Sequence, residues 1–168
     1  MFGSRGFTLI ELMVTFAVIA IVTIIAMPSM GNLIARQQLN KTTREVASTI
    51  SIARSQAALL RTATAMCLDK KADNSSVTSA QCAGSNITGY SSMTAAQKTL
   101  VEKNQIFMAK VDSTVSVKTG SAENIVFSPT GKLSTTSDVT FSLCNSRNNM
   151  RSIIVSFLGA IRQTEGTC

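Results

Sequence analysis

The sequence predicts an α+β fold in which one long N-terminal helix packs on an antiparallel β-sheet. Three observations lead to this fold class: an apolar run over residues 7–27, a helical apolar stripe that continues to residue 61, and alternating apolar and polar residues in the last third of the chain. The chain has 168 residues, of which 45% are hydrophobic and 15% charged. It is therefore long enough for one domain with an appendage and too apolar to be disordered throughout.

The apolar run at residues 7–27, FTLIELMVTFAVIAIVTIIAM, contains a single charge, that of Glu11. A helix rises about 1.5 Å per residue, so such a run is long enough to cross a hydrocarbon core of about 30 Å. A secretory signal peptide is the main competitor, but its apolar part is usually only about 7–15 residues long and precedes a small-residue cleavage site. We expect residues 7–28 to form a transmembrane helix.

Glu11 is unusual because it interrupts this apolar run. Burying an unpaired carboxylate in a membrane costs a few kcal/mol, so a glutamate in such a place needs a partner. The alternative is a side chain that reaches the headgroups from near the end of the helix.

Pro28 follows the apolar run and predicts a kink or local melting of the helix, because proline removes a backbone hydrogen bond. Beyond it, apolar residues recur at helical spacing: Leu39, Val46, Ile50, Ala53, Ala57 and Leu60. This stripe predicts that residues 29–61 continue the same helix with one face buried against a sheet.

The remaining residues, 62–168, predict a β-rich head domain. Strands are expected at 64–68, 106–111, 114–118, 125–127, 139–143 and 153–157. The second and third of these are expected to form a hairpin, and Ser128–Gly131 a turn. Residues 69–104 are polar and are expected to be a loop with one helical turn over residues 94–102.

Four cysteines lie beyond the apolar run, at positions 67, 82, 144 and 168. An even number in an exported domain predicts two disulfides, for which three connectivities are possible. We predict Cys67–Cys82 and Cys144–Cys168, the pairing that closes the two shortest loops. A metal site is not expected, because the spacings of zinc ligands are absent.

The composition argues against an enzyme. The chain has no His, which removes histidine-based triads, HExxH metal sites and Cys/His zinc fingers. The many serines and threonines have no marked base, and no cofactor is expected. The net charge of +7 is compatible with an anionic partner or with a solvated surface.

The segment Gly6-Phe7-Thr8-Leu9-Ile10-Glu11 resembles the class III signal motif of type IV pilins and type II secretion pseudopilins. The resemblance implies that residues 1–6 are a leader, which a prepilin peptidase removes between Gly6 and Phe7, and that the new amine of Phe7 is methylated. It also implies that Glu11 pairs with the Phe7 amine of a neighbouring subunit. At about 4 Å and an effective dielectric of about 20, this attraction amounts to about 4 kcal/mol.

Three later stretches resemble the GspH/FimT family of minor pilins and pseudopilins: IVFSPTGK at 125–132, VTFSLC at 139–144 and RSIIVSFLGAIR at 151–162. The resemblance implies a type IV pilin fold and a single-pass protein of the bacterial inner membrane with a periplasmic head. Its implied partners are other minor and major pilins and the inner-membrane assembly platform. The implied role is to prime pilus assembly at the tip, in support of twitching motility, adhesion or DNA uptake.

Two alternatives within the resemblance remain open. The first is a DNA-binding minor pilin of the FimT type, with Arg147, Arg151 and Arg162 as phosphate contacts. We do not favour it, because no aromatic stacking platform accompanies them and Ala160 stands where the family tail usually has its first arginine. Together with the C-terminal Cys168, this tail is more similar to the FimU-type priming subunit. The second is a minor pseudopilin of a type II secretion system.

Overall fold

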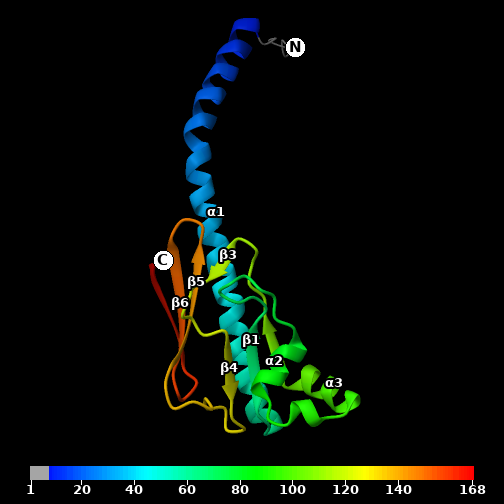
Figure 1. The fold of residues 1–168 in the computed structure, drawn as a ribbon. Helices are drawn as coiled ribbons and strands as arrows, with labels where there is room; N and C mark the ends of the chain where they lie inside the picture. Colours follow the sequence, from blue (N-terminus) through cyan, green and yellow to red (C-terminus); the bar gives the residue numbers. More distant parts are fainter. Residues whose placement is uncertain (1–7) are drawn as a thin grey trace, which may run out of the picture. The chain divides into compact units, whose positions relative to one another are not determined.

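The computed structural model of the protein describes residues 8–168, apart from the side chains of residues 25–29. The chain divides into two units, one ending at Ile34 and a compact one from Ala35 to Cys168. Figure 1 shows that the second half of the helix belongs to the compact unit together with all of the strands.

The helix α1 runs without interruption from Leu9 to Leu60, close to the expected bounds of residues 7–61. It continues through position 28, so proline does not end it there, and the kink expected at Pro28 stays a prediction. Among the described residues, no helix reaches the combination of length and hydropathy that a membrane crossing requires.

The chain after α1 folds into two sheets with short helices between their strands. Its elements are β1 (Thr64–Leu68), α2 (Ser79–Asn86), the 3-10 helix η1 (Tyr90–Ser92), α3 (Ala95–Asn104), β2 (Ile106–Ala109), β3 (Val115–Val117), β4 (Asn124–Phe127), β5 (Val139–Asn145), β6 (Asn149–Val155) and β7 (Ile161–Thr167). One sheet has the order β2-β1-β4 and the other β3-β5-β6-β7.

The predicted hairpin of residues 106–111 and 114–118 is wrong. Strand β2 pairs with β1 in parallel, whereas β3 pairs with β5 in the other sheet. A parallel pair needs a long crossover, and the helices α2 and α3 between β1 and β2 supply it. The expected turn at Ser128–Gly131 is confirmed, since the Gly131 N–H donates to the Ser128 carbonyl at 2.8 Å.

The loop predicted over residues 69–104 is also wrong for much of its length. Helices α2 and α3 each begin with a capping box, Thr78 with Gln81 and Thr94 with Gln97. In each box the threonine accepts the N–H of the glutamine, whose side chain accepts the N–H of the threonine. The helical turn expected over residues 94–102 is confirmed as part of α3.

Two hydrophobic clusters hold the compact unit together. In the first, the α1 stripe packs on both sheets, including Met66 of β1 and Phe141 of β5. Five of the six predicted stripe residues are buried, but Leu60 at the end of α1 is 45% exposed. In the second, Ala65 and Cys67 on the other face of β1 pack against α2 and α3. Strand β1 is therefore covered on both faces, and for this reason all five of its residues are buried.

Candidate functional site

The first half of α1 presents apolar side chains around its whole circumference. Large exposed residues run from Leu9, which is 77% exposed, to Ile24, which is 74% exposed. Glu11 is exposed among them, and its backbone N–H donates to Thr8 Oγ1 at 3.3 Å. Within residues 8–168, Glu11 forms no ion pair. We call this surface, residues 9–24, the apolar segment.

Gly6 and Phe7, the residues of the expected cleavage and methylation, lie outside the described part of the chain. The pairing of Glu11 with a Phe7 amine therefore stays a prediction.

Both disulfides in the structure have the connectivity expected from the sequence. Cys67 in β1 is joined to Cys82 in α2, and Cys144 in β5 is joined to Cys168 after β7, each with a Cα–Cα separation of 6.1 Å. The first bridge links α2 to the three-stranded sheet. The second ties down the end of β7, which needs it because the side chains of residues 162–167 are exposed and bury little apolar surface.

Arg54 on α1 is a structural residue that the sequence does not mark, because it falls outside the apolar stripe. Its Nε donates to the Gly131 carbonyl at 3.0 Å, Nη1 to the Gly159 carbonyl at 2.8 Å and Nη2 to the Leu158 carbonyl at 3.0 Å. One guanidinium thus connects the helix to the turn after β4 and to the turn between β6 and β7. A fork of fixed N–H donors suits arginine to this role.

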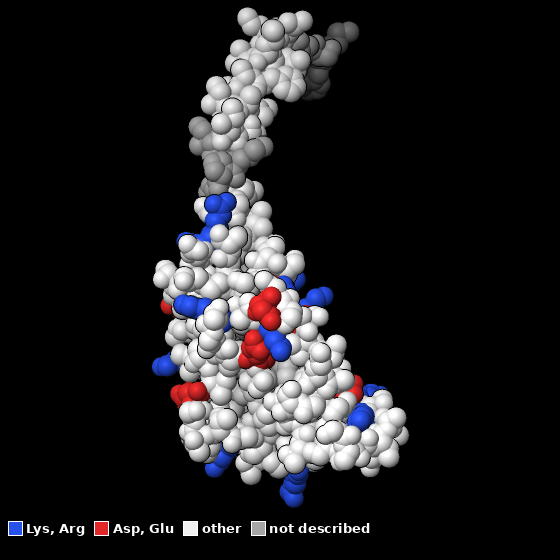
Figure 2. Space-filling view, in the orientation of Figure 1, with Lys and Arg blue, Asp and Glu red and all other residues white. Residues whose placement is uncertain are grey.

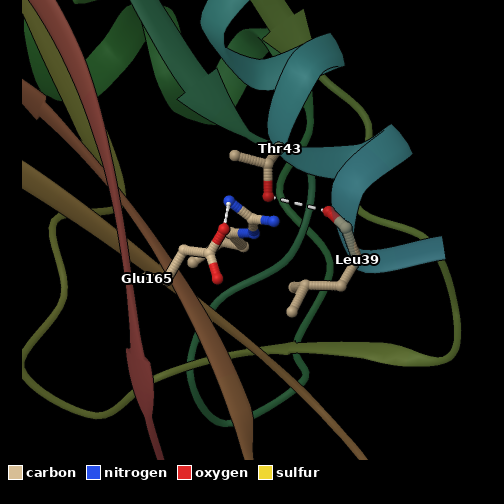
Figure 3. Close-up of polar contacts among 4 residues, drawn as sticks. Leu39, Thr43 and Glu165 are labelled. Atoms are coloured by element: carbon tan, nitrogen blue, oxygen red, sulfur yellow. Dashed lines mark hydrogen bonds and ion pairs between the residues drawn. The ribbon is translucent and has the colours of Figure 1, made fainter. Parts of the chain in front are cut away.

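The structure does not bring the three candidate DNA-contacting arginines together. Arg151 in β6 forms an ion pair with Glu165 of β7 at 2.6 Å, drawn at Glu165 in Figure 3. Arg162 pairs in register with Ile154 near one end of the β6–β7 hairpin, whereas Arg147 lies in the turn before β6, at the other end. At about 3.3 Å per residue, those two ends are about 20 Å apart.

The charges on one face of the compact unit are dispersed as well. On the face seen in Figure 2, blue and red side chains are scattered over the surface and do not merge into one basic patch. Within the described residues, no group of three or more Cys, Asp and Glu side chains is placed to hold a metal ion.

Buried hydroxyls lie on α1 and on the strand β1 that packs against it. Thr43 is 1% exposed, and its Oγ1 donates to the Leu39 carbonyl at 2.7 Å, as Figure 3 shows. Thr64 of β1 donates to the Ala53 carbonyl at 2.8 Å. Because each hydroxyl has a backbone partner, α1 buries these polar groups without leaving them unsatisfied.

Two models of known protein families match the chain. Residues 1–27 match the model of the prokaryotic N-terminal methylation motif, and residues 42–159 match the model of the type II transport protein GspH. No curated protein sequence matches the chain. The crystal structure of the type IV minor pilin FimU from Pseudomonas aeruginosa strain PAO1 is similar with 17% identity and a TM-score of 0.48, covering 77% of this chain and 90% of that one. Since the GspH model spans well over half of its residues, this chain belongs to the GspH family of type IV pilin-like proteins.

Proposed function

We propose that this protein is a minor pilin: a non-enzymatic structural subunit, anchored in the bacterial inner membrane by α1, that helps to start type IV pilus assembly at the tip. The observation that carries the proposal is the apolar segment, which has Glu11 in its first turn and lies within the residues 1–27 that match the methylation motif. An exposed apolar helix must be covered by lipid or by other subunits in the working protein.

Glu11 gives the apolar segment a means of recognising a neighbour. In a low-dielectric environment, a carboxylate without a partner is costly, whereas one beside an amine is strongly attracted to it. After removal of residues 1–6, the Phe7 amine of an adjacent subunit is a suitable cation, since α-amino groups titrate near pH 8. The pair would set the axial register between subunits.

The same proposal places the compact unit in the periplasm and names its partners. Two disulfides favour an oxidising compartment. A prepilin peptidase would process the N-terminus, and other minor and major pilins and the assembly platform would contact the mature subunit.

The test is Glu11→Ala in the native host, with Glu45→Ala as the matched control. Glu45 is also an exposed glutamate of α1, but it lies in the compact unit. We expect the Glu11 variant to accumulate in the inner membrane while surface piliation falls severalfold, and the Glu45 variant to piliate normally. Normal piliation with Glu11→Ala would refute the proposed role of the carboxylate.

A second candidate is a minor pseudopilin of a type II secretion system, which the description of the matched family model favours. Deleting the gene separates the two roles. A pilus subunit predicts loss of surface pili with unchanged secretion of exoproteins, whereas a pseudopilin predicts the reverse.

A further inference from the structure

Strand β7 forms one edge of the sheet β3-β5-β6-β7 and is drawn in red beside β6 in Figure 1. Of the four edge strands in the described part of the chain, β7 is the longest, with seven residues against four in β2 and β4 and three in β3. At the edge of β4, by contrast, the Ser134 N–H already donates to the Val126 carbonyl. The β7 edge therefore offers the longest row of backbone groups to another chain.

Alternate residues of β7 direct their backbone groups away from β6. The Cys168 N–H donates to the Asn148 carbonyl at 3.1 Å and the Ser156 N–H to the Ala160 carbonyl at 2.9 Å, so the even-numbered residues of β6 and β7 face each other. The outward N–H and carbonyl groups belong to Ile161, Gln163, Glu165 and Thr167. None of these groups has a hydrogen-bond partner among residues 8–168, and their spacing matches the backbone of another extended chain.

Strand β7 also lacks the features that usually protect an edge strand from pairing, such as proline, lysine or a bulge. Its sequence, IRQTEGT, has neither proline nor lysine, and seven consecutive pairs with β6 leave no bulge. The carboxylate of Glu165 is already neutralised by Arg151 at 2.6 Å. Arg162 is then the one charge of β7 without an ion pair in the described part of the chain, so an added strand meets little electrostatic opposition.

The face of β7 that points away from the core gives the edge its selectivity. Alternate residues of a strand share a face, which places Arg162, Thr164 and Gly166 together. A β-carbon on Gly166 would lie 2.7 Å from Cε of Met150, so the half-buried Met150 side chain lies over the glycine. An aromatic ring opposite Gly166 would pack on this thioether side chain. An acidic side chain opposite Arg162 would form a cross-strand ion pair.

We propose that the outer edge of β7 binds an extended segment of a partner protein as an added antiparallel strand, with an aromatic residue opposite Gly166 and an acidic residue opposite Arg162. The antiparallel direction continues a sheet in which all three pairs are antiparallel. In this direction the aromatic residue precedes the acidic one by four positions, and both lie on one face of the guest. A second copy of β7 is a poorer guest, because IRQTEGT has no aromatic residue.

The experiment uses the full chain, isotopically labelled and held in detergent micelles, titrated with the peptide Thr-Tyr-Thr-Thr-Thr-Glu-Val, acetylated and amidated at its ends. We expect NMR shifts and slower hydrogen exchange at the outward amides of Gln163 and Glu165. Exchange at Thr164 should change little, because its N–H already faces β6. Shifts confined to other strands would overturn the proposal. So would shifts at Gln163 that depend on protein concentration without peptide, because another copy of the chain would then be the occupant.

N-methylation of the peptide tests the backbone hydrogen bonds without altering the protein. A methyl group on the fifth residue, opposite Gln163, removes an N–H directed at β7 and should abolish binding. On the sixth residue, opposite Arg162, it removes an N–H that points away from β7, and binding should be retained. In the protein, Gln163→Pro removes an outward N–H and should also abolish binding, whereas Gln163→Ala should not. Equal effects of the two N-methylated peptides would contradict strand addition.

The proposed side-chain contacts determine which substitutions should weaken binding. Arg162→Ala should lower affinity up to about fivefold, the worth of one exposed ion pair, and so should glutamine in place of the peptide glutamate. The two changes together should cost no more than either alone. Arg44→Ala removes another exposed arginine, on α1, and is the control that should leave affinity unchanged. A peptide with its tyrosine and glutamate exchanged should bind more weakly, and equal affinity would refute the proposed register.

Discussion

Arg54 on α1 and Gly159 between β6 and β7 are in direct contact. Nη1 of Arg54 donates to the Gly159 carbonyl at 2.8 Å, and a β-carbon added to Gly159 would lie only 2.5 Å from Nε. Gly159 also has a φ of +81°, a region that residues with a β-carbon rarely occupy. This contact holds α1 close to the turn between β6 and β7, and it favours glycine at position 159 of that turn.

Arg54→Ala should destabilise the protein by about 1–3 kcal/mol, because it removes three hydrogen bonds from a charged donor that is partly exposed to solvent. Urea unfolding followed by circular dichroism measures the change. Arg44→Ala is the control, since Arg44 is also exposed on α1 but forms no comparable contact among the described residues, and it should change stability by less than about 0.5 kcal/mol. Equal effects of the two substitutions would contradict the role of Arg54.

Gly159→Ala should cost more than Gly131→Ala. Both glycines have positive φ, which costs an alanine about 1–2 kcal/mol, but a β-carbon at Gly131 meets its nearest neighbour at an ordinary 3.7 Å. Only the Gly159 substitution also displaces Arg54. In an Arg54→Ala background the extra cost should vanish, and a double-mutant cycle on unfolding free energies tests this coupling.

Non-reducing peptide mapping should recover Cys67 linked to Cys82 and Cys144 linked to Cys168. Replacing both cysteines of the second pair with serine should cost about 3 kcal/mol, because a loop in the unfolded chain is no longer closed. Hydrogen exchange should then accelerate in β7, for example at Thr164, and much less in α2. Faster exchange in α2 without a change in β7 would argue against this assignment of the bridge.

Asp112 should titrate below the ordinary range of an aspartate. The backbone N–H of Thr114 lowers the pKa of Asp112 most, followed by the Thr114 hydroxyl, with smaller contributions from Lys41 and Lys70. Because the pKa of Asp112 is lower in the folded than in the unfolded protein, the ionised carboxylate stabilises the fold at a pH above the unfolded pKa of about 3.9. This stabilisation is lost as the pH falls through the folded-state pKa. Thr114→Val should raise the pKa of Asp112 in a carboxyl NMR titration, whereas Thr99→Val on α3 should not.

The N-terminus should be processed. If residues 1–6 are a leader, mass spectrometry of the protein from its native host should find a chain that begins at Phe7 and carries one added methyl group. A bulky charged residue in place of Gly6 should leave the precursor uncut, while Gly6→Ala is tolerated. A mature chain that begins at Met1, or after Met27, would contradict the leader.

Patterns that are local in the chain were readable from the sequence alone. The apolar run and the stripe from Leu39 to Ala57 predicted a helix whose observed ends differ from the expected ones by one or two residues, because a helical period repeats over many turns. The class III motif and the three later stretches pointed to the family that the models match. The disulfide pairing followed from loop length.

Contacts between distant segments were decided only by the tertiary structure. The sequence predicted strands at residues 106–111 and 114–118, but a local pattern does not specify the partner of a strand, and the first of the two pairs in parallel with the buried strand β1. The polar composition of residues 69–104 did not indicate the two capped helices. Their folding becomes favourable because Cys82, Tyr90 and Val101 pack against Ala65 and Cys67 of β1.

The role of Arg54 could not be predicted from the sequence, because its three carbonyl partners lie 77 to 105 residues away. A sequence pattern records which residues prefer burial or a turn, whereas the meeting of a side chain with remote carbonyls exists only once the chain has folded.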